Sequence, residues 1–459
     1  MDHSLYVSEY FSQSAQKLSF YSWYGNAKLF HFHVPEDTVL LRWLLQASRG
    51  KGPECTSMEI TVYCLCIPEF ALTVDSLRHF RHGAPPVINP LGTRFPANAT
   101  VRPSYNISIT LSSAVQNTTF VNVTTPAAGD WFIAAHLPEA AGRIEVKGFS
   151  TPCPYMFQAD MFVLRLTDMP VLEPGVPMPH TVSPAKPLHV KIFVPKHAAG
   201  MRFQLSSCVT SEQRACTVRV LLGSITLPQS FQRSLTCTGS INCSLVLDSP
   251  PWEKWLQIMV ESLGTANASV SVEMLASFTV CRPGSASSFL NFISLNQSQA
   301  GARPGAAGSL APAAGEAPHN VSSQRSSCLQ SQPVVREDLD VVSVRYRLLN
   351  GPSVPVSSLA PTLLLLNLNT GMDSGGSLVV NLLLNKTSVS LANATVAACV
   401  SAASPVLSLN ATRTCSTAFS QGYPLSVSTS SAEAMLIVLY PQTDDWFLSL
   451  QLLCPKGQG

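Results

Sequence analysis

Charged side chains are scarce in this 459-residue sequence, at 12% of all residues, against about a quarter in an average soluble protein. There is no sustained Lys/Arg run, and the formal net charge is only +2, which excludes the basic surface that a nucleic-acid-binding domain needs. With 46% hydrophobic residues the chain can build several cores. A surface so poor in charge needs another source of solubility, and attached glycans would supply it.

Long hydrophobic runs are also missing. The apolar stretches PTLLLLNL (361–368) and AMLIVLY (434–440) have the length of strands, well short of the ~18 residues that cross a bilayer. The first residues, MDHSLYVSEYF, lack the basic and apolar regions of a secretion signal. We therefore expect a piece of a larger protein, cut at both ends.

Glycosylation acceptors are present in excess. With 18 Asn and 87 Ser or Thr, chance would give roughly three to four Asn-x-Ser/Thr motifs. The sequence has eleven, at Asn98, Asn106, Asn117, Asn122, Asn242, Asn267, Asn296, Asn320, Asn385, Asn393 and Asn410. This excess indicates a lumenal or extracellular glycoprotein, since accidental matches in a Ser/Thr-rich chain would be about a third as many.

The thirteen cysteines contain no Cys-x-x-Cys metal spacing, which argues against a zinc site and for disulfides. Three close pairs between strand-like segments are expected to form local disulfides: Cys208 with Cys216, Cys237 with Cys243, and Cys399 with Cys415. Longer-range disulfides are expected for Cys55, Cys153, Cys281 and Cys328. An odd total leaves at least one cysteine without a partner in the chain, and Cys454 is the candidate.

Short apolar or alternating runs, bounded by Pro, Gly, Asn and Ser, fill most of the chain, and 34 prolines leave little room for long helices. The pattern predicts an all-β protein of three tandem β-sandwich or jelly-roll-like domains. We place these domains at 1–168, 169–284 and 336–459. Residues 285–335 contain GARPGAAGSLAPAAGEAP, a low-complexity stretch that is typical of a linker.

A repeated motif supports this division. Pro, four residues, Trp and an apolar residue occur at PAAGDWF, PPWEKWL and PQTDDWF, with the tryptophans at Trp131, Trp255 and Trp446. Proline favours a turn, and a tryptophan offers a large surface to bury between two sheets. All three tryptophans are therefore predicted to be structural, each at the start of a strand that closes its domain.

Two segments resemble the signatures of a serine protease. AAH ends at His136, and GMDSGGS surrounds Ser374. The Trp strand is present in all three repeats, however, whereas the histidine occurs in one, and the two segments lie in different predicted domains. A catalytic triad needs its members within hydrogen-bond reach, so we interpret His136 as part of a core strand and Ser374 as part of a turn.

Other clusters are equally weak as candidate sites. His31 and His33 could share one face of a strand, but no third metal ligand is evident, and a surface pair is the simpler interpretation. His79, Arg81 and His82 form a small basic cluster typical of solvated surface. The acidic residues beside the tryptophans, Asp130, Asp444 and Asp445, could bind calcium or a carbohydrate, although capping the turn is the simpler role. We predict no catalytic residue, no metal and no cofactor.

Longer segments resemble the ectodomain of the transmembrane protein eight family. They span nearly the whole chain apart from the linker: SEYFSQSAQKLSFYSWYGNAKLFHFHVPEDTVLLRWLL, GAPPVINPLGTRFP, GDWFIAAHLP, LPQSFQRSLTCTG, REDLDVVSV, NTGMDSGGSL and FSQGYPLSVS. The resemblance implies a signal peptide, this glycosylated ectodomain, an EGF-like module and a seven-helix membrane domain that resembles ceramidase-type hydrolases. It also implies a phospholipase A2 that cleaves an acyl chain from GPI anchors, with its catalytic residues in the membrane domain.

The sequence departs from the family at three places. The signal is absent, the chain stops at CPKGQG before the EGF-like module, and Tyr63 to Phe80 interrupts a short passage of the family pattern. A partner for Cys454 would then lie beyond this sequence, and Cys64 and Cys66 would be additional to the disulfide framework.

Two functions follow as hypotheses. The first is a non-catalytic region, facing the cell exterior or the lumen of the secretory and lysosomal system, that positions GPI-anchored proteins for a membrane-embedded phospholipase A2. The second is an adhesion ectodomain that binds a cell-surface protein or glycan.

Overall fold

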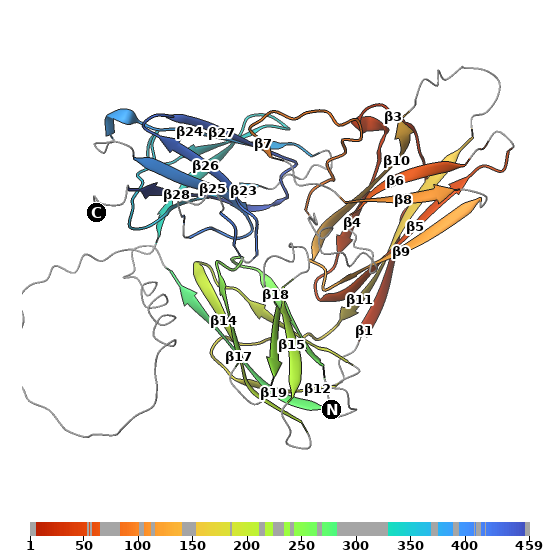
Figure 1. Cartoon of the computed structure of the whole chain (residues 1–459), viewed down its shortest axis with the longest axis horizontal. Helices are drawn as coiled ribbons and strands as arrows, with labels where there is room; N and C mark the ends of the chain where they lie inside the picture. Colours follow the sequence, from red (N-terminus) through yellow and green to blue (C-terminus); the bar gives the residue numbers. More distant parts are fainter. Residues whose placement is uncertain are drawn as a thin grey trace, which may run out of the picture.

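The computed structural model contains three units, each built from two main β-sheets (Figure 1). It describes residues 6–52, 55, 57–64, 83–100, 105–111, 115–139, 153–183, 186–210, 216–223, 234–238, 243–263, 269–281, 329–368, 375–388, 394–407, 409, 415–417 and 419–454. The helical turns in these ranges are η1 (Tyr24–Asn26) and η2 (Lys386–Ser388), and the rest of the regular structure is strand. The predicted all-β fold class is confirmed. No described helix could cross a membrane.

The first unit is a jelly roll. Its strands are β1 (Tyr6–Ser12), β2 (Gln16–Lys17), β3 (Phe20–Tyr21), β4 (Lys28–Val34), β5 (Thr38–Arg49), β6 (Met58–Cys64), β8 (Tyr105–Leu111), β9 (Gln116–Thr124), β10 (Gly129–Glu139) and β11 (Tyr155–Leu166). One sheet has the order β1-β11-β5-β9, and the other has β4-β10-β6-β8. Eight strands in two facing sheets, connected in this order, are the jelly-roll arrangement.

The second unit repeats the topology. Its strands are β12 (Met178–Val182), β13 (Leu188–Phe193), β14 (Ala198–Thr210), β15 (Thr217–Leu222), β16 (Ser234–Thr238), β17 (Cys243–Asp248), β18 (Trp255–Ser262) and β19 (Val270–Val280). The two sheets have the orders β12-β19-β14-β17 and β13-β18-β15-β16, so each strand has a counterpart in the first unit.

The third unit is less regular. Its strands are β20 (Gln330–Gln332), β21 (Val334–Asp338), β22 (Val344–Leu348), β23 (Thr362–Leu368), β24 (Ser377–Leu383), β25 (Thr395–Ala402), β26 (Tyr423–Ser428), β27 (Glu433–Leu439) and β28 (Asp444–Leu453). One sheet has the order β20-β23-β28-β25-β26, β21 and β22 form a hairpin, and β24 pairs with β27. Ordered strand thus begins at Gln330, inside the segment expected to be a linker, and most of that segment lies outside the described residues.

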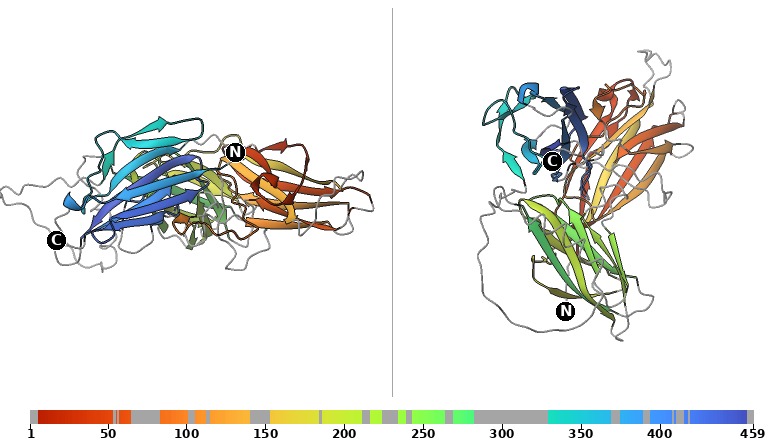
Figure 2. Two further views of the ribbon diagram at one scale, coloured as in Figure 1. Left: turned by 90° about the horizontal axis from the view of Figure 1, so that it is seen from above. Right: turned by 60° about the vertical axis from the view of Figure 1, so that its left-hand side comes forward.

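Alternation along the strands places the cores between the sheets. In β5, Leu41, Trp43, Leu45 and Ala47 are buried, and Arg42 between them is exposed, because successive side chains of a strand point to opposite faces. Trp43 packs edge-on against Phe32 from the opposing sheet. Figure 2 shows the two layers of each unit from further directions.

The repeated tryptophans do not all take the predicted place. Trp131 and Trp446 are buried in their cores, but Trp255 is 43% exposed, so its prediction as a buried residue is wrong. In the first unit Phe32 faces Trp131 across the ladder. Its counterpart in the second unit, Ile192, faces Leu256, and Trp255 is paired with the next residue, Phe193. The register differs by one residue, and such a shift moves every side chain to the opposite face.

Candidate functional site at the junction of the three units

The loop that enters β10, β18 or β28 has the same backbone shape in each unit. Thr125, Ser249 and Tyr440, each followed by proline, have positive φ angles of 46°, 48° and 47°. Their N–H groups donate to the carbonyl oxygens of Val39, Ala199 and Gly376, respectively. This conformation costs a non-glycine residue about 1 kcal/mol or more, and its presence in all three units shows that the Pro-x₄-Trp motif encodes a fixed turn.

These three turns come together where the units meet, and they surround a pocket of about 370 Å³. The first unit contributes residues such as Asp37 and Pro126, the second Lys254 and Trp255, and the third Phe419 and Asp444. Figure 1 shows the three units arranged around this centre. The pocket lies within the size range of small-ligand sites.

Ion pairs join the units at the pocket. Lys191 Nζ of the second unit lies 2.9 and 2.7 Å from the two carboxylate oxygens of Asp37 in the first. Lys254 of the second unit pairs with Asp444 of the third. Asp37 itself has a φ of 62°, a conformation that aspartate tolerates better than most residues. Charges of opposite sign therefore fix the relative position of the three turns.

The first and third units also share backbone hydrogen bonds. Gly83 N–H donates to the carbonyl of Asp130 in its own unit at 2.8 Å, and the Gly83 carbonyl accepts from Thr443 N–H of the third at 2.8 Å. Gly83 has a φ of 78°, and a Cβ there would lie 3.1 Å from the Cβ of Gln442. Nearby, the short strand β7 (Ala99–Thr100) adds in parallel to β27. The first unit thus completes one edge of a sheet in the third.

The second and third units share an apolar seam. The Trp252 side chain is 7% exposed, its Nε1–H donates to the Ala198 carbonyl at 2.8 Å, and its ring meets that of Phe447 at 5.4 Å. Leu363 and Phe419 of the third unit belong to the same buried cluster. Sequence reasoning singled out Trp255 and missed Trp252, although both belong to PPWEKWL.

Trp255 lines the pocket as its aromatic component. Its ring packs edge-on against Phe193 at 5.2 Å, and Lys191 Nζ lies 5.1 Å from its centroid. Acidic residues stand close by. Burial raises the pKa of Asp445, and the negative charge of the adjacent Asp444 carboxylate raises it further, by a smaller amount. A half-exposed aromatic ring beside several carboxylates is suited to a polar, hydroxyl-rich ligand with an apolar face.

His31 and His33 meet a partner that the sequence did not reveal. His31 Nε2 and His33 Nδ1 lie 3.0 and 3.1 Å from the same Asp130 oxygen. Burial alone would raise the pKa of Asp130, but hydrogen bonds from His33 and His31, together with their charge, lower it overall. The described part of the chain has no cluster of three or more residues suited to hold a metal, and the trio has its own internal pairing. His79, Arg81 and His82 lie outside the described residues.

His136 sits inside the first unit. It is 2% exposed, its Nδ1 lies 2.6 Å from the Leu137 carbonyl, and its ring meets Tyr21 at 4.7 Å. Burial lowers its pKa. A protease histidine must reach its substrate, which this buried ring does not. Ser374 and Asp373 lie outside the described residues.

The cysteines expected to pair locally are joined in the structure as Cys208–Cys216, Cys237–Cys243 and Cys399–Cys415. Cys55 is joined to Cys153, Cys281 is disulfide-bonded, Cys328 lies outside the described residues, and Cys454 is unpaired and exposed.

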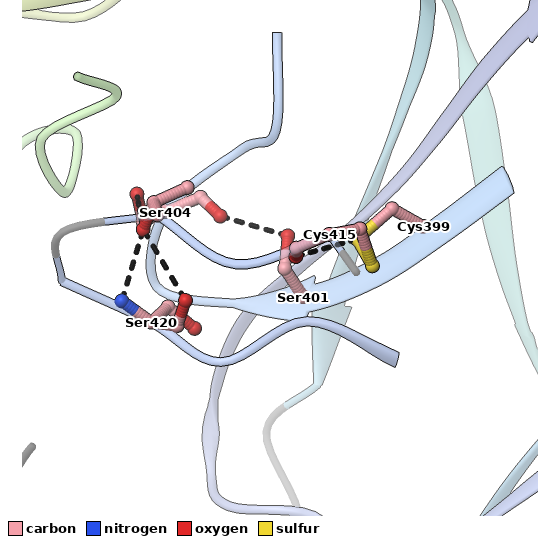
Figure 3. Close-up of a disulfide and its surroundings, with 6 residues drawn as sticks. Cys399, Ser401, Ser404, Cys415 and Ser420 are labelled. Carbon is pink, nitrogen blue, oxygen red and sulfur yellow. Dashed lines mark hydrogen bonds between the residues drawn. A yellow bond between two sulfur atoms is a disulfide. The ribbon is translucent and has the colours of Figure 1, made fainter. Parts of the chain in front are cut away.

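Figure 3 shows Cys399–Cys415 beside a buried group of serines, in which Ser401 Oγ donates to the Ser404 carbonyl. Ser404 Oγ in turn donates to the Ser249 carbonyl of the second unit. The serine group beside this disulfide therefore takes part in the junction.

Residues 332–459 match the family model described as the PGAP6/TMEM8 beta-sandwich domain. The chain is 49% identical to post-GPI attachment to proteins factor 6 of Mus musculus and 47% identical to that of Homo sapiens, and each alignment covers 98% of this chain and 56% of the relative. The chain is a PGAP6/TMEM8 relative. The resemblance noted in the sequence is thereby confirmed, and the chain spans little more than half the length of these curated relatives.

More distant comparisons add less. Transmembrane protein 8B of Mus musculus is 38% identical over 130 residues, which cover 28% of this chain and 28% of that protein. A solved triple jelly-roll protein of an archaeal virus covers 97% of this chain and 89% of its own at 11% identity, with a TM-score of 0.15. A TM-score this low does not support a shared fold. The jelly-roll assignment of this PGAP6/TMEM8 relative comes from its own strand order.

Four of the candidate glycosylation sites of this PGAP6/TMEM8 relative have described side chains. Asn385 is exposed, Asn98 is half-buried, Asn117 Nδ2–H donates to the Thr110 carbonyl, and Asn122 accepts from Arg42. Asn106 lies in β8. The remaining acceptors lie outside the described residues: Asn242, Asn267, Asn296, Asn320, Asn393 and Asn410.

Proposed function

We propose that this chain is a non-catalytic region of a protein that processes GPI-anchored proteins. The observation that supports the proposal is identity of 47–49% over 98% of the chain to proteins named post-GPI attachment to proteins factor 6. The complete protein acts as a phospholipase A2 that removes an acyl chain from the anchor. In this proposal its catalytic groups lie outside the chain, and the glycosylated region faces the cell exterior or the lumen of the secretory and lysosomal system.

Within this region, the junction pocket contacts the glycan part of the anchor. Its half-exposed Trp255 offers an aromatic face to the apolar side of a sugar ring. Glu36, Glu253 and Asp444 also line the pocket, and carboxylates accept hydrogen bonds from sugar hydroxyl groups. Contacts away from the scissile ester would position the acyl chain for hydrolysis, because orientation lowers the entropic cost of the reaction.

The test compares two activities of purified protein. The 459-residue chain should bind a GPI-anchored protein and release no fatty acid from its anchor, whereas the longer protein should release it. Acyl hydrolysis by the 459-residue chain would refute the non-catalytic role.

If the longer protein without residues 1–459 still releases GPI-anchored proteins from cells but no longer mediates cell attachment, the adhesion hypothesis replaces this one.

A further inference from the structure

The last strand of each complete jelly roll occupies an inner position of its sheet. In the first unit β11 follows β10 and inserts between β1 and β5, antiparallel to both. In the second unit β19 follows β18 and inserts in the same way between β12 and β14. This strand therefore closes the core of each sandwich.

The third unit has no counterpart of this strand among its described residues. Its β24 corresponds to β5 and β14, its β27 to β9 and β17, and its β28 to β10 and β18. Within the described ranges β24 pairs only with β27, so its other edge is open. Figure 1 shows β24 and β7 at opposite sides of β27.

The open position is a groove in the core, which we call the β24 slot. It has a volume of about 480 Å³ and lies between the β21–β22 hairpin and β24. Leu364, Leu366 and Leu448 of the facing sheet line it from below. On the β24 side Val379 lines the slot and is 49% exposed, which is unusual for an apolar residue of an edge strand, since proteins normally cover or charge such edges.

Backbone groups of β24 face the slot in an alternating pattern. Tyr440 N–H donates to the Gly376 carbonyl, and Leu384 N–H donates to the Ala432 carbonyl, so the even-numbered residues between them bond to β27. Val379 and Asn381 therefore direct their N–H and carbonyl groups into the slot. An incoming strand would find a hydrogen-bonding ladder on one side and an apolar floor below.

We infer that a further strand of the same polypeptide fills the β24 slot in the longer protein, antiparallel to β24 and with apolar side chains at alternate positions facing the leucines. In the second unit seven residues, 263–269, connect the corresponding strands. Only six residues follow Leu453 here, too few for a connection and a strand. The relatives are nearly twice as long as the matched region, which is 56% of their length.

Hydrogen exchange of β24 amides tests this inference. In the 459-residue chain the N–H groups of Val379 and Asn381 should exchange quickly, and in the longer protein they should slow on the order of 100-fold. Amides of β16, an edge strand of the second unit, serve as the internal control. Equal exchange of β24 in both proteins would overturn the inference. Slow exchange in the shorter chain that depends on concentration, with a dimer in sedimentation, would assign the slot to a second copy instead.

A pair of substitutions separates slot occupancy from simple unfolding. Val379→Pro removes an N–H that faces the slot and leaves the ladder to β27 intact, whereas Val379→Ala keeps that N–H. In the longer protein Val379→Pro should return Asn381 to the fast exchange of the shorter chain, and Val379→Ala should leave it slow. Slow exchange in both variants would contradict a strand bonded to β24.

Discussion

Lys191 Nζ lies 2.7 Å from Asp37 Oδ2 and ties the second unit to the first, with both side chains no more than 20% exposed. The same ammonium lies over the Trp255 ring. One lysine therefore links the position of two units to the wall of the junction pocket.

Lys191→Met should destabilise the protein by about 2 kcal/mol, because it leaves a partly buried carboxylate without its partner. The matched control is Arg347→Met, which breaks the exposed pair with Glu337 and should cost less than about 1 kcal/mol. Thermal unfolding of both variants measures the difference. Equal midpoints would show that the Lys191 pair has no structural role.

Trp252→Ala should cost about 3–5 kcal/mol, the usual loss for truncating a buried tryptophan. It would empty the seam against Phe447 and remove the hydrogen bond to Ala198. Trp255→Ala, three residues along the chain, should change the unfolding midpoint little because that ring is half-exposed. Denaturation curves with the opposite ranking would refute the assignment of Trp252 to the seam.

His189 makes stability depend on pH. Burial, followed by the charge of Lys186, lowers its pKa from 6.5 to about 4. A histidine with a lowered pKa in the folded state stabilises fully above pH 6.5, and this contribution is lost as pH falls toward 4, by up to about 3 kcal/mol. His189→Gln should flatten the pH dependence of unfolding in this window. An unchanged slope between pH 6.5 and 4 would contradict the prediction.

Gly422→Ala should disrupt the Cys399–Cys415 disulfide. A Cβ at Gly422 would collide with the Cys415 carbonyl oxygen and with both sulfur atoms. The disulfide closes a loop of 16 residues, for which chain entropy predicts a stabilisation of about 3 kcal/mol. Thiol titration of the unfolded variant should detect two additional free cysteines. Gly175→Ala is the control: at φ 82° it strains the backbone, but its Cβ meets no atom within 4 Å, so it should release no thiol.

Alternation of apolar residues predicted the all-β fold because each core needs one inward face per strand, as in Leu41, Trp43 and Leu45. The orientation of Trp255 could not be predicted, since it depends on a one-residue difference in register that both sequence motifs permit. The junction escaped detection for another reason. Its residues, such as Asp37, Lys191 and Asp444, are far apart in sequence, and only the packing of three units brings them to one pocket.

Binding of the anchor glycan to the junction pocket is the most direct test of the proposed function. A GPI-anchored protein with its acyl chains removed, and the same protein without the anchor, are titrated against the purified 459-residue chain by calorimetry. Only the anchored form should bind. Trp255→Ala should weaken binding at least about tenfold. Trp23 is an exposed tryptophan of the first unit that does not line the pocket, so Trp23→Ala should leave binding unchanged. Equal binding of both forms, or an equal effect of both substitutions, would contradict the account.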